Sequence, residues 1–316
     1  MDQKHKKVVV IGAGAVGTTY IYALLQKGVA EEVVLIDIDR RRVEGEVMDL
    51  SHGLPYIPPV AIRGGDYDEC ADANLIVFTA GAKQTPGQSR TELIRQNADI
   101  VRDACRRIAQ SGSEAVLLMV TNPVDSLTYV ALKELGWPRR RVIGSGTVLD
   151  SARFRYLIGS HCGIDVHNIH AYILGEHGDS EFAAWSLTHV AGVAIKDYCR
   201  LCSSCAKEED HLTAIFEKMR NSAYHIIDYK GATYYGIGMS LARITGAVLR
   251  NEHSILAVSS RIDGHYGLPE VCLSMPAIIG KDGIERLITP ELPPDELDAL
   301  KHSAGVIRET LDSIDA

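Results

Sequence analysis

Two segments in the middle of the chain carry side chains that can move a proton and hold an anion. Residues 175–180 read GEHGDS and contain His177, whose imidazole titrates near neutral pH and can donate a proton in a reaction. Residues 149–155 read LDSARFR, where Asp150 and Arg153 share one face of a predicted helix. A guanidinium binds a carboxylate through two parallel hydrogen bonds, a geometry that lysine lacks. Taken alone, His177 would more often be a hydrogen-bonded core residue, so its context decides its role.

A glycine-rich segment near the N-terminus predicts a dinucleotide site. Residues 12–17 read GAGAVG and fit the GxGxxG pattern between a predicted strand and a predicted helix. Gly12 permits the tight turn, Gly14 lets the backbone approach a pyrophosphate, and Gly17 lets helix and strand pack closely. Asp37 follows the second predicted strand, where an acid binds the ribose hydroxyls and repels a 2′-phosphate. NAD is therefore favoured over NADP, although the arginines at 40–42 could pair with such a phosphate.

The elements that position these motifs change character near residue 144. Strands are expected at residues 8–11, 33–38, 60–62, 75–80, 115–120 and 142–143, and helices at 16–27, 43–50 and 91–110. Apolar strands separated by helices predict an α/β, doubly wound parallel sheet (a Rossmann domain) over residues 1–144. Residues 145–316 predict an α+β catalytic domain packed against it, with a ligand cleft between them. Its expected helices are 208–229, 234–249 and 294–314, and its expected strands are 169–174, 255–258 and 271–275.

Together with residues 81–90 (GAKQTPGQSR) and 121–125 (TNPVD), these motifs closely resemble the L-lactate/malate dehydrogenase family. The resemblance runs in order from Lys7 to about Arg286, nearly the whole chain. It implies hydride exchange between NAD and a 2-hydroxy acid, with His177 as proton donor. Asp150 would orient the imidazole and raise its pKa. Arg153 would hold the substrate carboxylate, and Arg90, after a mobile loop, would polarise the carbonyl and help to exclude water.

The resemblance also assigns further binding residues. The predicted substrate-binding residues are Gln84, Arg90, Asn122, Arg153 and Thr233. The predicted cofactor-binding residues are Gly12, Gly14, Val16, Gly17, Asp37, Arg42, Tyr67, Gly81, Ala82, Asn122 and Ser145. Gln84 decides the substrate, because malate-specific members carry an arginine there that pairs with the extra carboxylate of oxaloacetate. The neutral glutamine predicts pyruvate and L-lactate, as in glycolysis-linked fermentation, while longer 2-oxo acids stay open.

Assembly and regulation are expected by the same resemblance. A homotetramer is expected. Arg155 and His170 match positions that bind fructose 1,6-bisphosphate in allosteric bacterial relatives, but both residues are also consistent with a plain subunit interface. Only seven residues precede the first predicted strand, so the long N-terminal arm of vertebrate tetramers is expected to be absent, which favours a bacterial-type protein.

Composition excludes several other classes. The formal net charge of −8 argues against binding to nucleic acid or to anionic membranes. The apolar run at residues 8–11 is broken at once by glycines, unlike a signal peptide, and no stretch is long enough to span a membrane. Seven cysteines form no evident disulfide framework, which predicts a reducing cytoplasm.

Two alternatives remain beside this interpretation. Cys199, Cys202 and Cys205 form a CxxCxxC run, but iron–sulfur clusters normally need a fourth thiolate in register and none follows, so we expect thiols on a helix and no metal. A non-catalytic NAD-binding redox sensor would need neither His177 nor Asp150, and both are present.

We expect Gln84→Arg to shift the substrate preference toward oxaloacetate. The new arginine would pair with the second carboxylate, which a glutamine leaves unpaired in a desolvated site. The ratio of kcat/KM for oxaloacetate to that for pyruvate should rise at least about tenfold, or about 1.4 kcal/mol. Steady-state NADH oxidation measures this ratio, and an unchanged ratio would refute the assignment.

Overall fold

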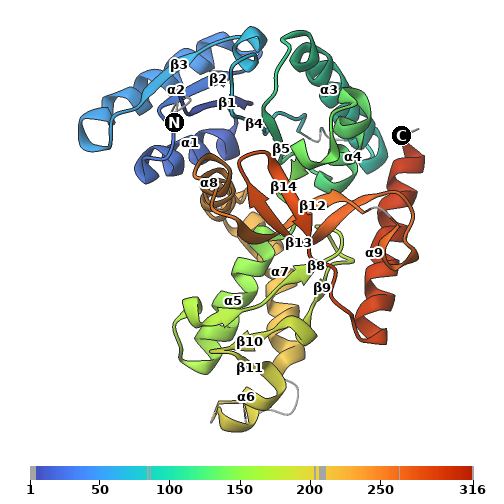
Figure 1. Cartoon of the computed structure of the whole chain (residues 1–316). Helices are drawn as coiled ribbons and strands as arrows, with labels where there is room; N and C mark the ends of the chain where they lie inside the picture. Colours follow the sequence, from blue (N-terminus) through green and yellow to red (C-terminus); the bar gives the residue numbers. More distant parts are fainter. Residues whose placement is uncertain are drawn as a thin grey trace.

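One nine-stranded sheet runs through the molecule, and helices cover both of its faces (Figure 1). The computed structural model describes residues 5–83, 85, 87–202, 204–205, 211–262 and 264–314. The strand order is β14-β13-β12-β6-β5-β4-β1-β2-β3. The sheet therefore combines strands from both halves of the chain.

Six of these strands are parallel and come from the first half. They are β1 (Lys7–Ile11), β2 (Glu32–Ile36), β3 (Ala61–Gly64), β4 (Leu75–Phe78), β5 (Val116–Met119) and β6 (Val142–Gly144). Four of them (β1, β4, β5 and β6) are buried at every position, which explains their unbroken apolar runs. The helices between them are α1 (Ala15–Lys27), α2 (Arg40–His52), α3 (Arg90–Gln110) and α4 (Val124–Leu135). The predicted doubly wound sheet is confirmed, and α4 is a helix that the sequence analysis did not expect.

Three antiparallel strands from the second half extend the same sheet. They are β12 (Ser254–Arg261), β13 (Cys272–Gly280) and β14 (Gly283–Leu287). β12 joins β6 through the pair Ser259 and Gly144, directly beside the predicted boundary at residue 144. The sheet thus continues across that boundary, and the division into two domains stays a prediction.

The remaining elements form the lower part of the molecule and one flank of the sheet. The helices are α5 (Val148–Cys162), α6 (Ile195–Leu201), α7 (His211–Lys230), α8 (Tyr235–Leu249) and α9 (Pro294–Ser313). Small sheets contain β7 (Ile169–His170), β8 (Ile173–Leu174), β9 (Phe182–Ala183), β10 (His189–Val190) and β11 (Val193–Ala194). Short 3₁₀ turns occur at Leu54–Tyr56, Tyr67–Cys70, Arg139–Arg141, Val166–Asn168, Trp185–Leu187 and His265–Gly267. The prediction of one strand at residues 169–174 is wrong, because β7 pairs with β10 while β8 pairs with β9.

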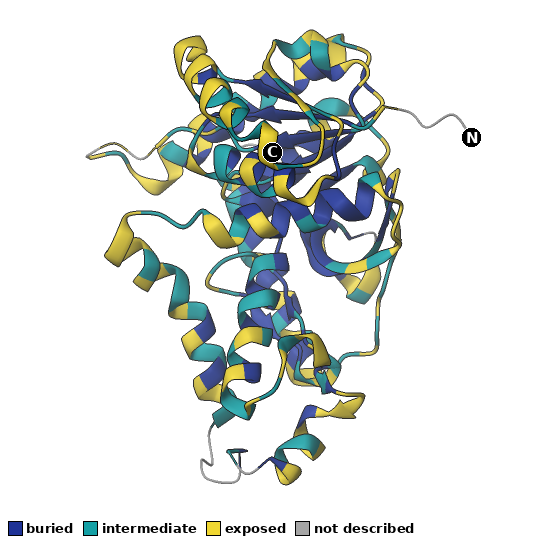
Figure 2. Cartoon of the chain, turned by 90° about the vertical axis from the view of Figure 1, so that its left-hand side faces the viewer, coloured by how far each residue is buried: buried dark blue, intermediate teal, exposed yellow. Residues whose placement is uncertain are grey.

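Apolar side chains form a core on each face of the large sheet. Helices α3, α4 and α9 contribute to one core, and α1 and α8 contribute to the other. A third, smaller core lies in the lower part, between α5, α6 and α7. Figure 2 shows the buried sheet and the exposed outer turns of the helices. No helix within the described ranges is both long enough and apolar enough to cross a membrane.

A buried hydroxyl pair links α1 to α8 and can be tested. The Tyr20 hydroxyl lies 2.7 Å from Thr245 Oγ1, and both residues are fully buried. Thr245 Oγ1 donates its hydroxyl proton to the Leu241 carbonyl oxygen and therefore accepts the hydrogen bond from the Tyr20 hydroxyl. Tyr20→Phe should therefore lower the free energy of unfolding by about 1 kcal/mol in urea titrations.

Tyr56→Phe is the matched control, because Tyr56 is 89% exposed on a short 3₁₀ turn that belongs to neither helix. Its change should be within about 0.5 kcal/mol. Equal losses in the two variants would contradict a specific contribution from the Tyr20 hydroxyl.

Candidate active site

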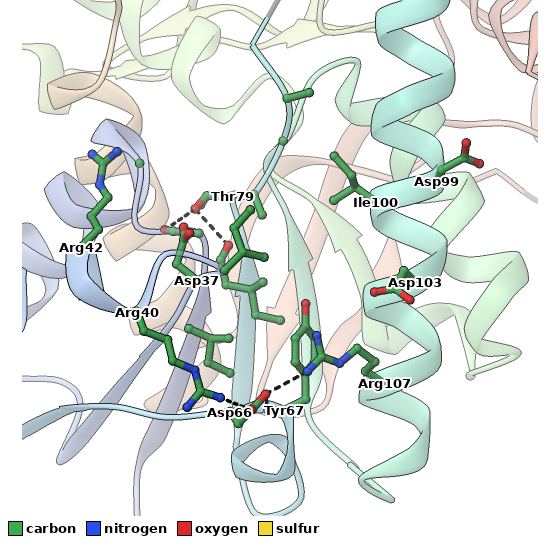
Figure 3. Close-up of a pocket in the computed structure, with 18 of the residues that line it drawn as sticks. Asp37, Arg40, Arg42, Asp66, Tyr67, Thr79, Asp99, Ile100, Asp103 and Arg107 are labelled. Atoms are coloured by element: carbon green, nitrogen blue, oxygen red, sulfur yellow. Dashed lines mark hydrogen bonds and ion pairs between the residues drawn. The ribbon is translucent and has the colours of Figure 1, made fainter. Parts of the chain in front are cut away.

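A cleft of about 870 Å³ lies at the carboxyl ends of β1, β2 and β4 (Figure 3). This edge of a doubly wound sheet is where nucleotides bind. Of the predicted cofactor residues, the cleft is lined by Gly12, Gly14, Asp37, Arg42, Tyr67, Gly81 and Ala82. Val16, Gly17, Asn122 and Ser145 are not among its lining residues, so their cofactor contacts stay predictions.

The glycine-rich turn between β1 and α1 is shaped as the motif requires. Gly12 has a φ of +114°, and a Cβ there would lie 2.6 Å from the Ala80 nitrogen. A Cβ on Gly17 would collide with the Gly12 carbonyl oxygen. Gly14, which caps α1, faces open space. The turn therefore leaves room for a pyrophosphate at the N-terminus of α1, whose N–H groups attract anions.

Asp37 is held in place at the end of β2. Its carboxylate accepts hydrogen bonds from the backbone nitrogens of Ala13 (2.7 Å) and Asp39 (3.0 Å). This fixed negative charge at the rim of the cleft disfavours a 2′-phosphate.

The arginines of the cleft are paired with acids. Arg40 and Arg107 both contact Asp66, at 3.2 and 3.0 Å (Figure 3). Arg107 also stacks on the Tyr67 ring, 3.9 Å from its centroid. Arg42 lies 3.7 Å from Glu46. The sequence analysis did not foresee Arg107, because its place in the cleft depends on how α3 packs.

Asn97 fixes two predicted binding segments to α3. It is 4% exposed, and its Oδ1 accepts a hydrogen bond from the Ala82 nitrogen at 2.8 Å. Its Nδ2 donates to the Asn122 carbonyl oxygen at 3.3 Å. A polar residue on the buried face of an amphipathic helix was the available signal, and the sequence analysis missed it.

Asp150 is the centre of a cluster that contains three of the predicted site residues. It is 2% exposed on the first turn of α5. His177 Nδ1 lies 2.6 Å from Asp150 Oδ2, and Arg153 Nη1 donates to Asp150 Oδ1 at 2.8 Å. The His177 backbone nitrogen donates to Asp125 Oδ2 at 2.7 Å, which fixes the loop after β8. The structure thus brings together three residues that the sequence placed in two separate motifs.

The electrostatics favour a charged His177. Burial lowers the pKa of His177, but the charge and hydrogen bond of Asp150 outweigh it and raise that pKa to about 9. Burial likewise works against the Asp150 carboxylate, yet His177 and Arg153 hold the Asp150 pKa below its ordinary value. Burial raises the pKa of Asp125 to about 6. At neutral pH the cluster is therefore a carboxylate between two cations.

Glu181 is a further buried carboxyl that the sequence analysis missed. Its side chain has an oxygen within 4.8 Å of ligand atoms of Asp150 and His177. Burial, followed by the Asp150 charge, raises the pKa of Glu181 well above its ordinary value. Burial and the Asp150 charge therefore both favour the neutral form of Glu181, while Asp150 is the carboxylate that contacts His177. Its position directly after GEHGDS was the available signal.

The predicted loop arginine begins a helix. Arg90 is the first residue of α3, which Ser89 and Glu92 cap reciprocally. Tyr224 on α7 donates to Asp179 at 2.6 Å, which raises the Tyr224 pKa, and the Arg90 charge opposes that shift. Arg90 therefore lies near the segment that follows His177.

The two other predicted substrate residues are placed less closely. Thr233 lies in the turn between α7 and α8, and Gln84 falls outside the described residues.

The remaining predicted residues lie in the second half. Arg155 follows on α5, where Nε donates to the Ser151 carbonyl at 3.3 Å and burial lowers the arginine pKa. His170 is exposed on β7.

The prediction that all three cysteines of the CxxCxxC run lie on a helix is wrong, because α6 ends at Leu201 and contains only Cys199.

Comparisons with known proteins cover almost the whole chain. Residues 6–144 match the family model described as lactate/malate dehydrogenase, NAD binding domain. Residues 147–316 match the model described as lactate/malate dehydrogenase, alpha/beta C-terminal domain. An L-lactate dehydrogenase of Treponema denticola is 54% identical over 311 residues, which cover 98% of each chain. One of Acetivibrio thermocellus is 47% identical, again over 98% of each chain.

Solved structures agree with the sequence relatives. A lactate dehydrogenase from a Medee basin deep-sea metagenome library superposes with a TM-score of 0.97 at 45% identity, covering 99% of this chain and all of that one. The ligands-bound minor L-lactate dehydrogenase of Enterococcus mundtii gives a TM-score of 0.95 at 42% identity, covering 98% and 99% of the two chains.

The pairing of His177 with Asp150 predicts a titration that a variant should change. Asp150→Asn removes the charge that raises the His177 pKa from its ordinary value to about 9, so this pKa should fall by at least about one unit. In the unmodified protein, the raised His177 pKa adds to the free energy of unfolding. This contribution is fully present below about pH 6.5 and is lost as pH rises through about 9, because His177 then loses its proton. Histidine NMR titration and urea unfolding at several pH values measure both effects.

Asp165→Asn is the matched control, because Asp165 pairs with the exposed His167 at 2.6 Å, away from the cluster. It should leave the His177 titration unchanged. A His177 pKa that stays at about 9 in Asp150→Asn would contradict the assigned cause.

Proposed function

The chain belongs to the lactate/malate dehydrogenase family, and on that premise we propose that it is an NAD-dependent L-lactate dehydrogenase. It would reduce pyruvate to L-lactate and catalyse the reverse reaction. The observation that carries the proposal is the His177–Asp150–Arg153 cluster around a buried carboxylate, which would combine a proton donor with a carboxylate-binding cation.

His177 is assigned as the proton donor. Bound NADH supplies the hydride to the carbonyl carbon, and the carbonyl oxygen needs a proton at the same time. Asp150 engages Nδ1, so Nε2 is the nitrogen that gives its proton to that oxygen. The pKa of about 9 keeps the imidazole protonated at neutral pH, ready for reduction. In the reverse direction, neutral His177 accepts the proton of the lactate hydroxyl.

Arg153 is assigned to the substrate carboxylate. Its contact with Asp150 uses one Nη1 donor, and a guanidinium carries five donors in a planar fork. A bidentate contact with the carboxylate would fix both the position and the orientation of the carbonyl. Arg90 is assigned to the carbonyl oxygen, Asn122 to substrate and nicotinamide, and Thr233 to the wall of the substrate pocket. Gln84 is assigned to the discrimination of pyruvate from oxaloacetate.

The cofactor assignment rests on the cleft beside β1 and β2. Gly12, Gly14, Val16 and Gly17 would receive the pyrophosphate, and Asp37 the adenosine ribose. Exposed Ile38 and the Tyr67 ring give the cleft apolar walls that suit an adenine. We assign Arg42, Gly81, Ala82 and Ser145 to the same cofactor.

We extend the proposal to a homotetramer that responds to fructose 1,6-bisphosphate. Tyr22 on α1 and Tyr235 and Met239 on α8 are more exposed than large apolar side chains usually are, at 61%, 66% and 65%. α1 and α8 pack together, so these side chains suit contact with a second copy. Arg155 would supply a guanidinium and His170 an imidazole N–H donor for a bisphosphate.

The first experiment measures NADH oxidation with pyruvate and with oxaloacetate, each with and without fructose 1,6-bisphosphate. A strong preference for pyruvate supports the proposed activity. Bound NADH without turnover of either substrate would refute it. An unchanged pyruvate KM and unchanged oligomeric state at saturating bisphosphate would refute the effector site alone.

Arg153→Lys should reduce kcat/KM for pyruvate about 10- to 100-fold, because lysine keeps the charge but loses the bidentate geometry, a loss of about 1.4–2.8 kcal/mol. Arg106→Lys is the matched control, since Arg106 is 61% exposed and pairs with Glu134 on the protein surface. Stopped-flow NADH binding should be normal in both variants. Equal kinetics in the two variants would contradict the role of Arg153.

A further inference from the structure

Four thiols and an imidazole converge at the lower end of the molecule, far from the large sheet (Figure 1). Cys162 ends α5, Cys199 lies on α6, Cys202 and Cys205 follow α6, and His211 begins α7. No fourth thiol continues the CxxCxxC run in register, but the fold supplies one from Cys162, 37 residues before Cys199. The sequence predicted no metal because a fourth thiolate in register was missing. In the folded chain, Cys162 provides a fourth thiol close to the other three.

The spacing of the donor atoms matches a single ion. Cys162 Sγ lies 4.0 Å from Cys205 Sγ, and the sulfurs of Cys162, Cys202 and Cys205 all lie within 4.8 Å of one another. Cys199 and His211 lie within the same limit of Cys205. Four sulfurs bound tetrahedrally to zinc at about 2.3 Å would lie about 3.8 Å apart. In a 4Fe–4S cluster each thiolate binds a different iron, so the cysteine sulfurs lie farther apart than around one ion.

The surroundings suit a structural metal site. Cys202 and Cys205 are 8% and 5% exposed. The third core packs around the cluster, with Tyr198, Leu212 and Phe216 among its members. An apolar shell of this kind limits the access of water to bound metal. Aliphatic side chains would fill this part of the core equally well. Core packing alone therefore does not require four thiols at one point.

We propose that Cys162, Cys199, Cys202 and Cys205 form a tetrahedral zinc site that fastens the end of α5 to the segment between α6 and α7. Cys162, Cys202 and Cys205 provide three thiolates, and rotation of the Cys199 side chain completes the set. His211 Nε2, which lies 3.2 Å from Cys199 Sγ, hydrogen-bonds to that sulfur. The His211 ring stacks on His161 with centroids 5.4 Å apart and planes 2° apart, which fixes its orientation. Binding of one Zn²⁺ releases the thiol protons to solvent and involves no electron transfer.

The test begins with the full-length protein, purified under reducing conditions without chelator or metal-affinity resin. Elemental analysis should find one zinc per chain. After metal removal, Co²⁺ titration should produce the thiolate-to-metal charge-transfer and tetrahedral ligand-field bands of a four-sulfur site, saturating at one ion per chain. Zinc should raise the Tm of the metal-free protein, and its affinity should fall as pH falls.

Variants assign the ligands. Cys162→Ser and Cys199→Ser should each abolish stoichiometric binding, whereas His211→Ala should weaken it about 10- to 100-fold, as loss of a group that supports a ligand does. Cys105→Ala is the matched control, because Cys105 is buried on α3 outside the cluster, and it should retain one zinc per chain. Normal NADH binding shows that each variant has folded.

Several results would overturn the proposal. They are the absence of charge-transfer bands from reduced, metal-free protein, zinc retained in Cys162→Ser, and iron with acid-labile sulfide in the isolated protein. A disulfide between Cys162 and Cys205 found by mass spectrometry in the reduced preparation would do the same. Loss of binding in His211→Ala with full binding in Cys199→Ser would overturn the four-thiolate assignment. None of these results bears on pyruvate reduction, so the two proposals fail separately.

Discussion

The buried charge of Asp150 is the constraint around which the candidate active site is organised. A carboxylate that is 2% exposed is stable only when its oxygens are paired, and each oxygen has one cationic partner. Removing either partner would leave a buried charge uncompensated, so His177 and Arg153 are fixed by the same requirement. The group that raises the His177 pKa is thus also the group that positions the arginine. In the proposed mechanism, proton donation and carboxylate binding would depend on one ion cluster rather than on two separate sites.

The continuous sheet brings this cluster and the nucleotide cleft into one body. β12 pairs with β6, and α8 from the second half packs on α1, the helix that follows the glycine-rich turn. Asn97 adds a polar connection, because it holds both the Ala82 and the Asn122 backbones to α3. The segments that would meet cofactor and substrate are therefore anchored to the same sheet. Hydride transfer requires this, since small errors in the distance between the reacting atoms reduce its rate strongly.

The sequence predicted those features that depend on local pattern. The six parallel strands appear as apolar runs because parallel strands are buried on both faces, and the glycines of the first turn have strict steric roles. Features that depend on tertiary packing were missed or misplaced. Residues 169–174 look like one strand, but β7 and β8 turn toward different partners. Glu181, Asn97 and Arg107 gain their importance only from neighbours that lie far away in the sequence. The same holds for Cys162, because no local sequence pattern relates it to the CxxCxxC run and only the fold brings them together.

Helix α5 connects the two clusters that the chain builds in its second half. Asp150 lies in its first turn and Cys162 is its last residue, so the 12 residue steps between them span about 18 Å. A helix transmits a displacement of one end to the other, because its backbone bonds resist bending. Val148, at the start of α5, belongs to a core of the large sheet, whereas Cys162 packs against the smaller third core, which buries fewer apolar side chains. A metal bound to Cys162 would add at that end the rigidity that the small core lacks, and it would do so without placing a second charge near His177.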